Sequence, residues 1–261
     1  MRTEFETVDY EISGGIARIQ LDRPRRLNAV VPRLIEDLCG ALDAARRDEA
    51  GAIILSGRGR AFCAGHDLRH AEKPGAEDEE RRRLERIQDV TRKIHAAPCA
   101  VVAAVRGYAL GAGCEFALRS DLVVASGDAR FGFPEVGVGL SVTGGISRVL
   151  PLAVGPAKAK ELVLLGEHFG AREAASLGLV NRVVDDEELE DAALSLAESL
   201  RDRPRLALTL AKRALDSGAQ SGIEEAYALE VEHALEVNRS EDAERAADDF
   251  RRRAQPSRRG T

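Results

Sequence analysis

The stretch that decides the fold is AVVAAVRGYALGAGCEFALRSDLVVA, residues 100–125. Its two ends, Ala100–Val105 and Leu122–Ala125, are short runs of Val, Ala and Leu that predict buried strands. Between them, Ala112–Arg119 predicts a short helix that begins after a glycine turn. Because parallel strands need a crossover connection between them, the stretch favours an α/β fold with mainly parallel pairing.

The same alternation extends outward from this stretch through residue 185. Further strands are predicted at Ile16–Leu21, Ala52–Ser56 and Leu179–Val184, and further helices at Pro32–Arg47 and Glu79–His95. After residue 186 the pattern is helical only, with helices predicted at 187–201, 204–217, 222–238 and 240–253. Helices that do not return to a sheet must bury their apolar faces elsewhere, and we expect a neighbouring subunit to cover them, with packing on their own core as the alternative.

Composition limits the classes of partner. The 261 residues are 44% hydrophobic, enough for a sizeable core, and the net charge of −6 gives no reason to expect a nucleic-acid partner. The most apolar stretch, residues 98–118, contains Arg106 and Glu115, so no membrane partner is expected. The N-terminus lacks an apolar segment, and the four cysteines are scattered. We therefore expect a cytoplasmic protein with reduced thiols.

A first candidate site is AFCAGHDL, residues 61–68. Small residues and Gly65 follow a predicted strand and leave backbone N–H groups accessible, and the helix expected after them adds the positive end of its dipole. Asp67 is interpreted as a cap of that helix. The turn suits an oxygen that becomes negative, although strand-to-helix turns with a glycine are also common without any function.

A second turn of the same layout occurs in GYALGAGCEFAL, residues 107–118. Gly111 and Gly113 flank Ala112, so the backbone can approach a ligand closely and its amides point toward the helix entrance. Together the two turns can form an oxyanion hole with two donors, while close packing alone is the alternative explanation of the glycines.

Two carboxylates accompany these turns. Glu115 lies among apolar residues and Glu135 follows Phe131-Gly132-Phe133-Pro134. Burial would raise the pKa of both acids, and proximity would hold one proton on the pair near neutral pH. One carboxyl can then act as a base and the other as an acid.

In order and spacing, these motifs resemble the crotonase superfamily of acyl-CoA enzymes, and the carboxylate pair is most similar to its enoyl-CoA hydratase branch. The segments that carry the resemblance are LDRPRRLNAV, AFCAGHDL, VRGYALGAGCEFAL, SDLVVAS, ARFGFPEVGVGL and GPAKAKELVLLGEHFGAREAASLGLVNRVV. The resemblance implies an α/β fold, a crotonase-like spiral of ββα units with a C-terminal helical trimerisation region. We expect an acyl-CoA-binding core at 1–195, a helical oligomerisation region at 196–254 and a disordered tail at 255–261. The implied assembly is a homo-oligomer, a trimer or a dimer of trimers.

The resemblance also implies the site. The backbone N–H groups of His66 and Ala112 would bind the thioester oxygen, and Glu115 and Glu135 would be the catalytic carboxylates. The expected substrate-binding residues are Arg25, Arg26, Ala64, Gly65, Asp67, Leu68, Arg69 and Gly111, with the three arginines bordering the nucleotide part of coenzyme A. The implied reaction adds water to a 2-enoyl-CoA thioester. No cofactor is expected, since coenzyme A enters as part of the substrate, and no metal, since His66 and His70 lack the glutamate of H-E-x-x-H.

One loop departs from the hydratase pattern. Typical hydratases have Pro-Gly-x-Gly-Gly after the second glutamate, where this chain has Ser141-Val142-Thr143-Gly144-Gly145. A Δ3,Δ2-enoyl-CoA isomerase and an acyl-CoA thioester hydrolase of the same superfamily therefore stay open as alternatives, as does a non-catalytic acyl-CoA-binding oligomer.

Overall fold

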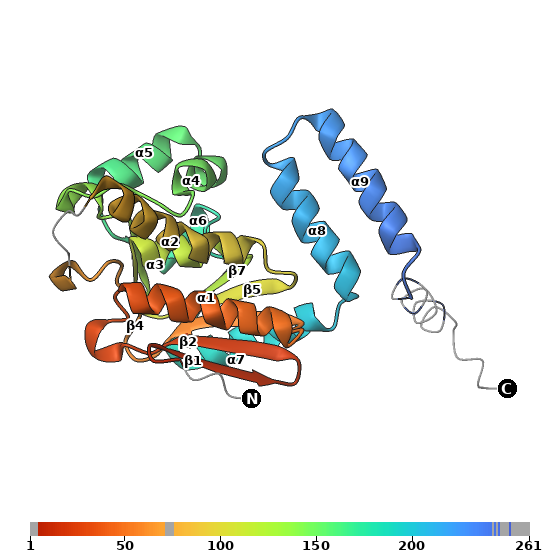
Figure 1. The fold of residues 1–261 in the computed structure, drawn as a ribbon, viewed down its shortest axis with the longest axis horizontal. Helices are drawn as coiled ribbons and strands as arrows, with labels where there is room; N and C mark the ends of the chain where they lie inside the picture. The colour runs from red at the N-terminus through yellow and green to blue at the C-terminus, as the bar shows by residue number, and fades with distance from the viewer. Residues whose placement is uncertain (1–4, 71–75, 242, 244, 246–250, 252–261) are drawn as a thin grey trace. The chain divides into compact units, whose positions relative to one another are not determined.

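The computed structural model describes residues 5–70, 76–241, 243, 245 and 251, and the fold is shown in Figure 1. The chain divides into two compact units, Met1–Glu198 and Ser199–Thr261. The first unit contains the sheets, and the described part of the second is helical. The expected tail at 255–261 and most of the helix predicted at 240–253 lie outside the described residues.

The larger sheet of the first unit has the strand order β1-β2-β3-β5-β7-β10. Its strands are β1 (Val8–Ser13), β2 (Ile16–Leu21), β3 (Ala52–Gly57), β5 (Ala100–Val105), β7 (Leu122–Ser126) and β10 (Arg182–Val184). The β1–β2 pair is antiparallel and every other pair is parallel, which confirms the predicted mainly parallel sheet.

A smaller sheet of very short strands accompanies the larger one, in the order β4-β6-β8-β9. Its members are β4 (Ala61–Cys63), β6 (Tyr108–Leu110), β8 (Arg130–Gly132) and β9 (Phe169–Gly170). Each of β3, β5 and β7 is followed along the chain by one short strand and then by helical structure. The chain therefore repeats a ββα unit, and parallel pairing of β4 with β6 and of β6 with β8 aligns the ends of the short strands.

Helices cover the sheets of the first unit (Figure 1). They are α1 (Pro32–Arg47), α2 (Glu77–His95), α3 (Ala112–Arg119), α4 (Ile146–Val154), α5 (Pro156–Leu165), α6 (Ala171–Ser176) and α7 (Leu189–Arg201). Helix α1 begins with a proline at its first turn and buries Leu34, Leu38 and Leu42 along one face, as its spacing predicted. The strand predicted at 179–184 was too long, because Leu179 and Val180 precede β10 in a turn whose Leu179 N–H bonds to Ala174 O.

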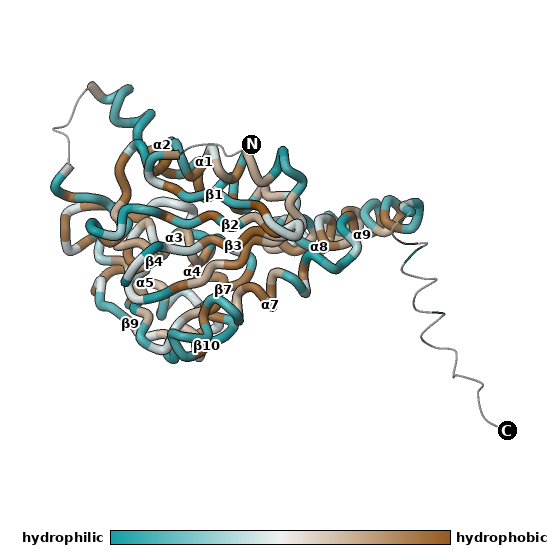
Figure 2. The backbone as a smooth tube through the Cα atoms, turned by 90° about the horizontal axis from the view of Figure 1, so that it is seen from below, coloured by the Kyte–Doolittle hydropathy of each residue, from teal (hydrophilic) through white to brown (hydrophobic). Residues whose placement is uncertain are grey.

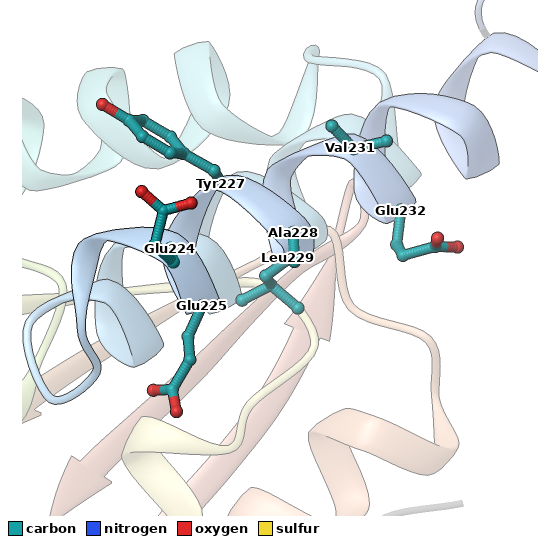
Figure 3. Close-up of a pocket in the computed structure, with 7 residues that line it drawn as sticks. All are labelled: Glu224, Glu225, Tyr227, Ala228, Leu229, Val231 and Glu232. Atoms are coloured by element: carbon teal, nitrogen blue, oxygen red, sulfur yellow. The ribbon is translucent and has the colours of Figure 1, made fainter.

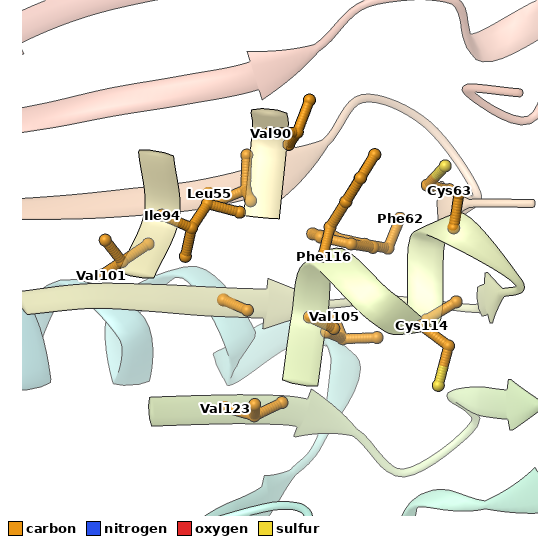
Figure 4. Close-up of a cluster of buried hydrophobic side chains, with 14 of the residues drawn as sticks. Leu55, Phe62, Cys63, Val90, Ile94, Val101, Val105, Cys114, Phe116 and Val123 are labelled. Atoms are coloured by element: carbon orange, nitrogen blue, oxygen red, sulfur yellow. The ribbon is translucent and has the colours of Figure 1, made fainter. Parts of the chain in front are cut away.

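The core lies between the central strands and helices α1, α2 and α3. All six residues of β5 are buried, and the tube is coloured hydrophobic along β3, its neighbour in the sheet (Figure 2). Figure 4 shows part of the buried cluster, in which Phe62 of β4 and Phe116 of α3 are both fully buried. Large aromatic side chains therefore anchor the segments beside both glycine turns. Phe62 lies in β4, before the first turn, and Phe116 lies in α3, after the second.

The second unit contains two helices in contact, α8 (Arg205–Gly218) and α9 (Ile223–Asn238). These bounds lie within one residue of the predicted ones. Ile223, Tyr227, Val231 and Leu235 recur every four residues along α9, and all four are exposed. Figure 3 shows a surface hollow on α9 in which Tyr227 and Val231 point away from Glu225 and Glu232. No helix among the described residues is long and apolar enough to cross a membrane.

Asn28 ties the chain before α1 to the first short strand. Its side chain is fully buried, its Oδ1 accepts the N–H of Arg23 at 2.8 Å, and its Nδ2 donates to Ala61 O at 2.8 Å and to Arg58 O at 3.1 Å. Its φ of 54° lies in the left-handed region that asparagine tolerates better than most residues. One side chain thus fixes the backbone on both sides of the β3–β4 turn.

We predict that Asn28→Ala lowers the free energy of unfolding by about 2–4 kcal/mol, because three buried hydrogen bonds are lost and the left-handed backbone becomes less favourable. Urea denaturation measures the change. Arg25→Ala, at an exposed position of the same segment, is the control and should change stability by less than about 0.5 kcal/mol. Equal effects of the two substitutions would show that Asn28 has no such role.

Candidate functional site

The two glycine turns touch one another. Gly65, after β4, has a φ of 81°, and a Cβ on it would lie 2.8 Å from Leu110 O and 3.6 Å from Gly111 Cα. Gly111, after β6, has a φ of 53°. The backbone conformation therefore disfavours a side chain at both positions, and at Gly65 the backbone of the other turn also leaves no space for one. The parallel pairing of β4 with β6 places these turns at the same edge of the small sheet.

The amide groups of His66 and Ala112 are available in this arrangement. The N–H of Val30 donates to Gly65 O at 2.7 Å, and the N–H of Asp67 donates to Val30 O at 3.0 Å. The N–H of His66, which lies between these two bonds, takes no part in the pairing with Val30. Ala112 is the first residue of α3, where an N–H has no acceptor within the helix. Within the described part of the chain, neither N–H donates a hydrogen bond to the protein. Neither N–H therefore has a protein acceptor that would compete with a ligand oxygen.

Glu115 lies in the first turn of α3 and is fully buried. Its carboxylate accepts two hydrogen bonds from one residue: Thr143 N–H donates to Oε1 at 2.7 Å, and the Thr143 hydroxyl donates to Oε2 at 2.7 Å. Burial raises the pKa of Glu115, and these two hydrogen bonds act in the opposite direction because they favour the charged form.

Glu135 is the second buried acid, and its environment differs. Its Oε1 would lie 3.0 Å from a Cβ on Gly111, which places the carboxyl beside the second glycine turn. Its Oε2 is buried and has no hydrogen-bond partner among the described residues. Burial raises the pKa of Glu135 to about 7, and repulsion from Glu115 adds to the rise. The two carboxyls are thus electrostatically coupled.

Three ionisable side chains near the turns, those of His66, Cys63 and Cys114, favour their uncharged forms near neutral pH. Burial, with a contribution from Arg83, lowers the pKa of His66, which favours the uncharged imidazole. Burial raises the pKa of the Cys63 thiol to about 12 and also raises the pKa of the Cys114 thiol. Both thiols therefore stay protonated, and neither is available as a thiolate nucleophile.

The other residues expected at the site have varied surroundings. Asp67 forms an ion pair with Arg23 at 3.4 Å and accepts the N–H of Arg69 at 3.3 Å. Among the described residues, the helix expected after it is a 3-10 turn, Leu68–His70, whereas the second glycine turn leads directly into an α-helix and its positive end. Ala64 is half-buried and Leu68 is exposed. The arginines expected to contact the nucleotide are also exposed, namely Arg25, Arg26 and Arg69.

Sequence reasoning missed Thr143, Arg23 and Asn28. The loop around Thr143 stood out only as a departure from a pattern, and its contact with Glu115 joins segments 28 residues apart. The sequence signal for this contact was Gly144, the glycine after Thr143. It has a φ of 60°, and a Cβ on it would lie 2.9 Å from Glu115 Oε2. Among the described residues, no group of three His, Cys, Asp or Glu side chains is arranged to hold a metal ion.

We predict that Glu135→Gln becomes more stable relative to the parent protein as pH rises from about 4.5 to about 7. The folded parent holds the proton of Glu135 more tightly than the unfolded chain does, so its free energy of unfolding falls across this window. The glutamine variant lacks this dependence. Urea denaturation at both ends of the window measures the difference, and Glu187→Gln, an exposed position, is the control. A stability difference that does not change with pH would contradict the raised pKa.

The comparisons with known proteins agree on one family. A family model described as "Enoyl-CoA hydratase/isomerase" matches residues 11–260. A Rhodobacter capsulatus protein named "Probable enoyl-CoA hydratase" is 38% identical over 87% of this chain and 88% of its own length. The "1,2-epoxyphenylacetyl-CoA isomerase" of Escherichia coli is 33% identical over 91% of this chain and 92% of its own. The crystal structure of a Mycobacterium smegmatis enoyl-CoA hydratase superposes with a TM-score of 0.90 at 30% identity, covering 97% of this chain and 98% of that one.

Proposed function

Since this chain belongs to the enoyl-CoA hydratase/isomerase family, within the crotonase superfamily, we propose that it adds water across the double bond of a 2-enoyl-CoA thioester. The chain is an enzyme of that family, and its fold is the crotonase-like spiral of ββα units. The observation that carries the proposal is the placement of two amides without a protein acceptor near two buried carboxyls that differ in hydrogen bonding.

The amides of His66 and Ala112 form the oxyanion hole in this proposal. They donate to the thioester oxygen, polarise the conjugated double bond and stabilise the enolate that forms when the β carbon is attacked. Loss of one such donor typically costs about 3 kcal/mol of transition-state stabilisation. Because both donors belong to the main chain, a histidine side chain at the first position is compatible with the role.

The two acids divide the proton transfers. Glu115 is the base: it removes a proton from water while the water oxygen bonds to the β carbon. Glu135 is the acid: it delivers a proton to the α carbon as the enolate collapses to the thioester. A proton then passes from Glu115 to Glu135, which restores both carboxyls for the next turnover. The reaction as written needs no redox step and no cofactor beyond the coenzyme A of the substrate.

The phosphates of coenzyme A require cationic partners. Arg25, Arg26 and Arg69 are exposed, and Arg69 follows closely after the first glycine turn. Guanidinium groups bind phosphate through paired hydrogen bonds, so these arginines are the proposed nucleotide contacts. Asp67, held by Arg23, fixes the backbone between His66 and Arg69 rather than contacting the phosphates.

An isomerase that moves a double bond within the acyl chain is the second candidate. Glu135 has a free oxygen and a pKa raised to about 7, so it can remove and return a proton by itself while Thr143 occupies Glu115. The similarity to the isomerase from Escherichia coli is a further reason to test it. Since the chain is an enzyme, the non-catalytic alternative is not retained, and no contact favours a thioester hydrolase.

We predict that the purified protein consumes the conjugated double bond of crotonyl-CoA or of longer 2-enoyl-CoAs, with a gain of one water by mass spectrometry. Glu115→Gln and Glu135→Gln should each lower kcat by about 10²–10⁴-fold, because each removes a proton-transfer group. Glu187→Gln, at an exposed position, should retain the parent kcat.

Other outcomes separate the candidates. Full activity in both glutamine variants would reject the assigned roles. Exchange of α hydrogens in deuterium oxide without hydration would favour the isomerase, and release of free coenzyme A would favour the hydrolase.

We also propose that the helical C-terminal region mediates a homo-oligomer. The exposed stripe on α9 that contains Tyr227 and Val231 supports this proposal, because a large exposed apolar stripe is unfavourable in water unless a partner covers it. The parent protein should have the mass of a trimer or hexamer by light scattering, and the double variant Tyr227→Asp with Val231→Asp should have a lower mass. Glu232→Gln, on the other side of α9, is the control. A monomeric parent would contradict the proposal.

A further inference from the structure

Thr143 is the residue that distinguishes the two buried acids. It donates a hydrogen bond to each carboxylate oxygen of Glu115: its N–H donates to Oε1 and its hydroxyl to Oε2, each at 2.7 Å. Gly144 closes on the same carboxylate, since a Cβ there would lie 2.9 Å from Oε2 and 3.0 Å from the Glu115 Cβ. The carboxylate plane of Glu115 is therefore fixed from one side by a single turn of the chain.

Among the described residues, Glu135 receives no donor from another residue, and only its own backbone N–H acts against the rise in its pKa. Its Oε2 is buried without a hydrogen-bond partner in the described part of the chain. A carboxylate oxygen in that state is costly, and a protonated carboxyl avoids much of the cost because it carries no charge. The pKa values follow the same division: burial raises the pKa of Glu135 to about 7, whereas the hydrogen bonds from Thr143 oppose the effect of burial on Glu115.

We propose that Thr143 is a positioning residue that keeps Glu115 ionised and correctly oriented, so that the single proton shared by the two acids resides on Glu135. This inference rests on the proposed function and deepens it, because hydration requires one base and one acid. The side-chain hydroxyl is the decisive group, since any residue except proline at position 143 would retain the backbone N–H. The hydroxyl also keeps two lone pairs, with which it can accept a hydrogen bond from the attacking water.

Few other groups can influence the proton on Glu115. The titratable groups coupled to it among the described residues are Glu135 and the thiols of Cys63 and Cys114. Both thiols stay protonated because burial raises their pKa. A change in the titration of Glu115 can therefore be assigned to Thr143 once Glu135 has been replaced.

The first test needs no substrate. In a Glu135→Gln background, the titration of Glu115 is followed by carboxyl infrared difference spectroscopy, and Glu115→Gln identifies its signal. Thr143→Val removes the hydroxyl and keeps the branched shape, and it should raise the pKa of Glu115 by about one unit or more, while Thr143→Ser should restore the lower value. Ser141→Ala, at an exposed position of the same loop, should leave the titration unchanged.

The outcomes are decisive in either direction. An unchanged pKa of Glu115 in Thr143→Val would overturn the proposal. If that variant does not fold, Thr143→Ala provides a second deletion of the hydroxyl to which the same criterion applies.

The second test uses turnover in the otherwise unchanged enzyme. Activity requires ionised Glu115, so the acidic limb of the pH profile of kcat/KM should move to higher pH in Thr143→Val and return in Thr143→Ser. At a pH on that limb, kcat/KM should fall about tenfold for each unit of the shift. A residue with only a structural role would lower activity without moving the limb.

The two tests separate two kinds of failure. If the parent hydrates enoyl-CoA and the limb does not move, this inference alone fails. If the parent hydrates no enoyl-CoA, the proposed function fails, and the infrared titration still decides the role of Thr143.

Discussion

The close approach of the turns at Gly65 and Gly111 is the constraint on which the rest of the site depends. A side-chain carbon on Gly65 would lie 2.8 Å from Leu110 O, closer than such atoms come in folded proteins. Only bare backbone lets the two turns that follow the paired strands β4 and β6 approach so closely, just before the amides of His66 and Ala112. The large aromatic side chains Phe62 and Phe116, buried beside these turns, keep them from moving apart.

The second constraint is electrostatic. Two acids are buried next to this backbone, and burial of two charged carboxylates is unfavourable. The fold relieves one of them with two donors from Thr143 and leaves an oxygen of the other without a partner. Two glutamates thereby acquire different proton affinities, and the proposed transfer of protons in opposite directions depends on that difference. The difference arises from a loop, not from the acids themselves.

The sequence was sufficient for several of the longer elements, although strand β1 and helices α4 and α5 were not predicted, and it was insufficient for the shortest strands. The predicted bounds are confirmed for α1, α3, β2 and β5, because these segments are long enough for their apolar residues to indicate a helix or a buried strand. Strands β4, β6 and β8 have three residues each, too few for a period, yet they align the glycine turns. The glutamates stood out because they are charged residues in apolar surroundings. Thr143 did not, since its importance comes from a contact with a residue 28 positions away.

The central claim, that two main-chain amides bind the thioester oxygen, is tested most directly by the carbonyl stretching frequency of a bound saturated acyl-CoA labelled with ¹³C at the thioester carbon. Such a ligand binds without reacting, and isotope-edited infrared spectroscopy isolates its carbonyl. Two fixed donors in a site that excludes water polarise the carbonyl more than bulk water does. The frequency should therefore fall below its value in water when the ligand binds. A bound ligand whose frequency equals or exceeds the value in water would contradict the account.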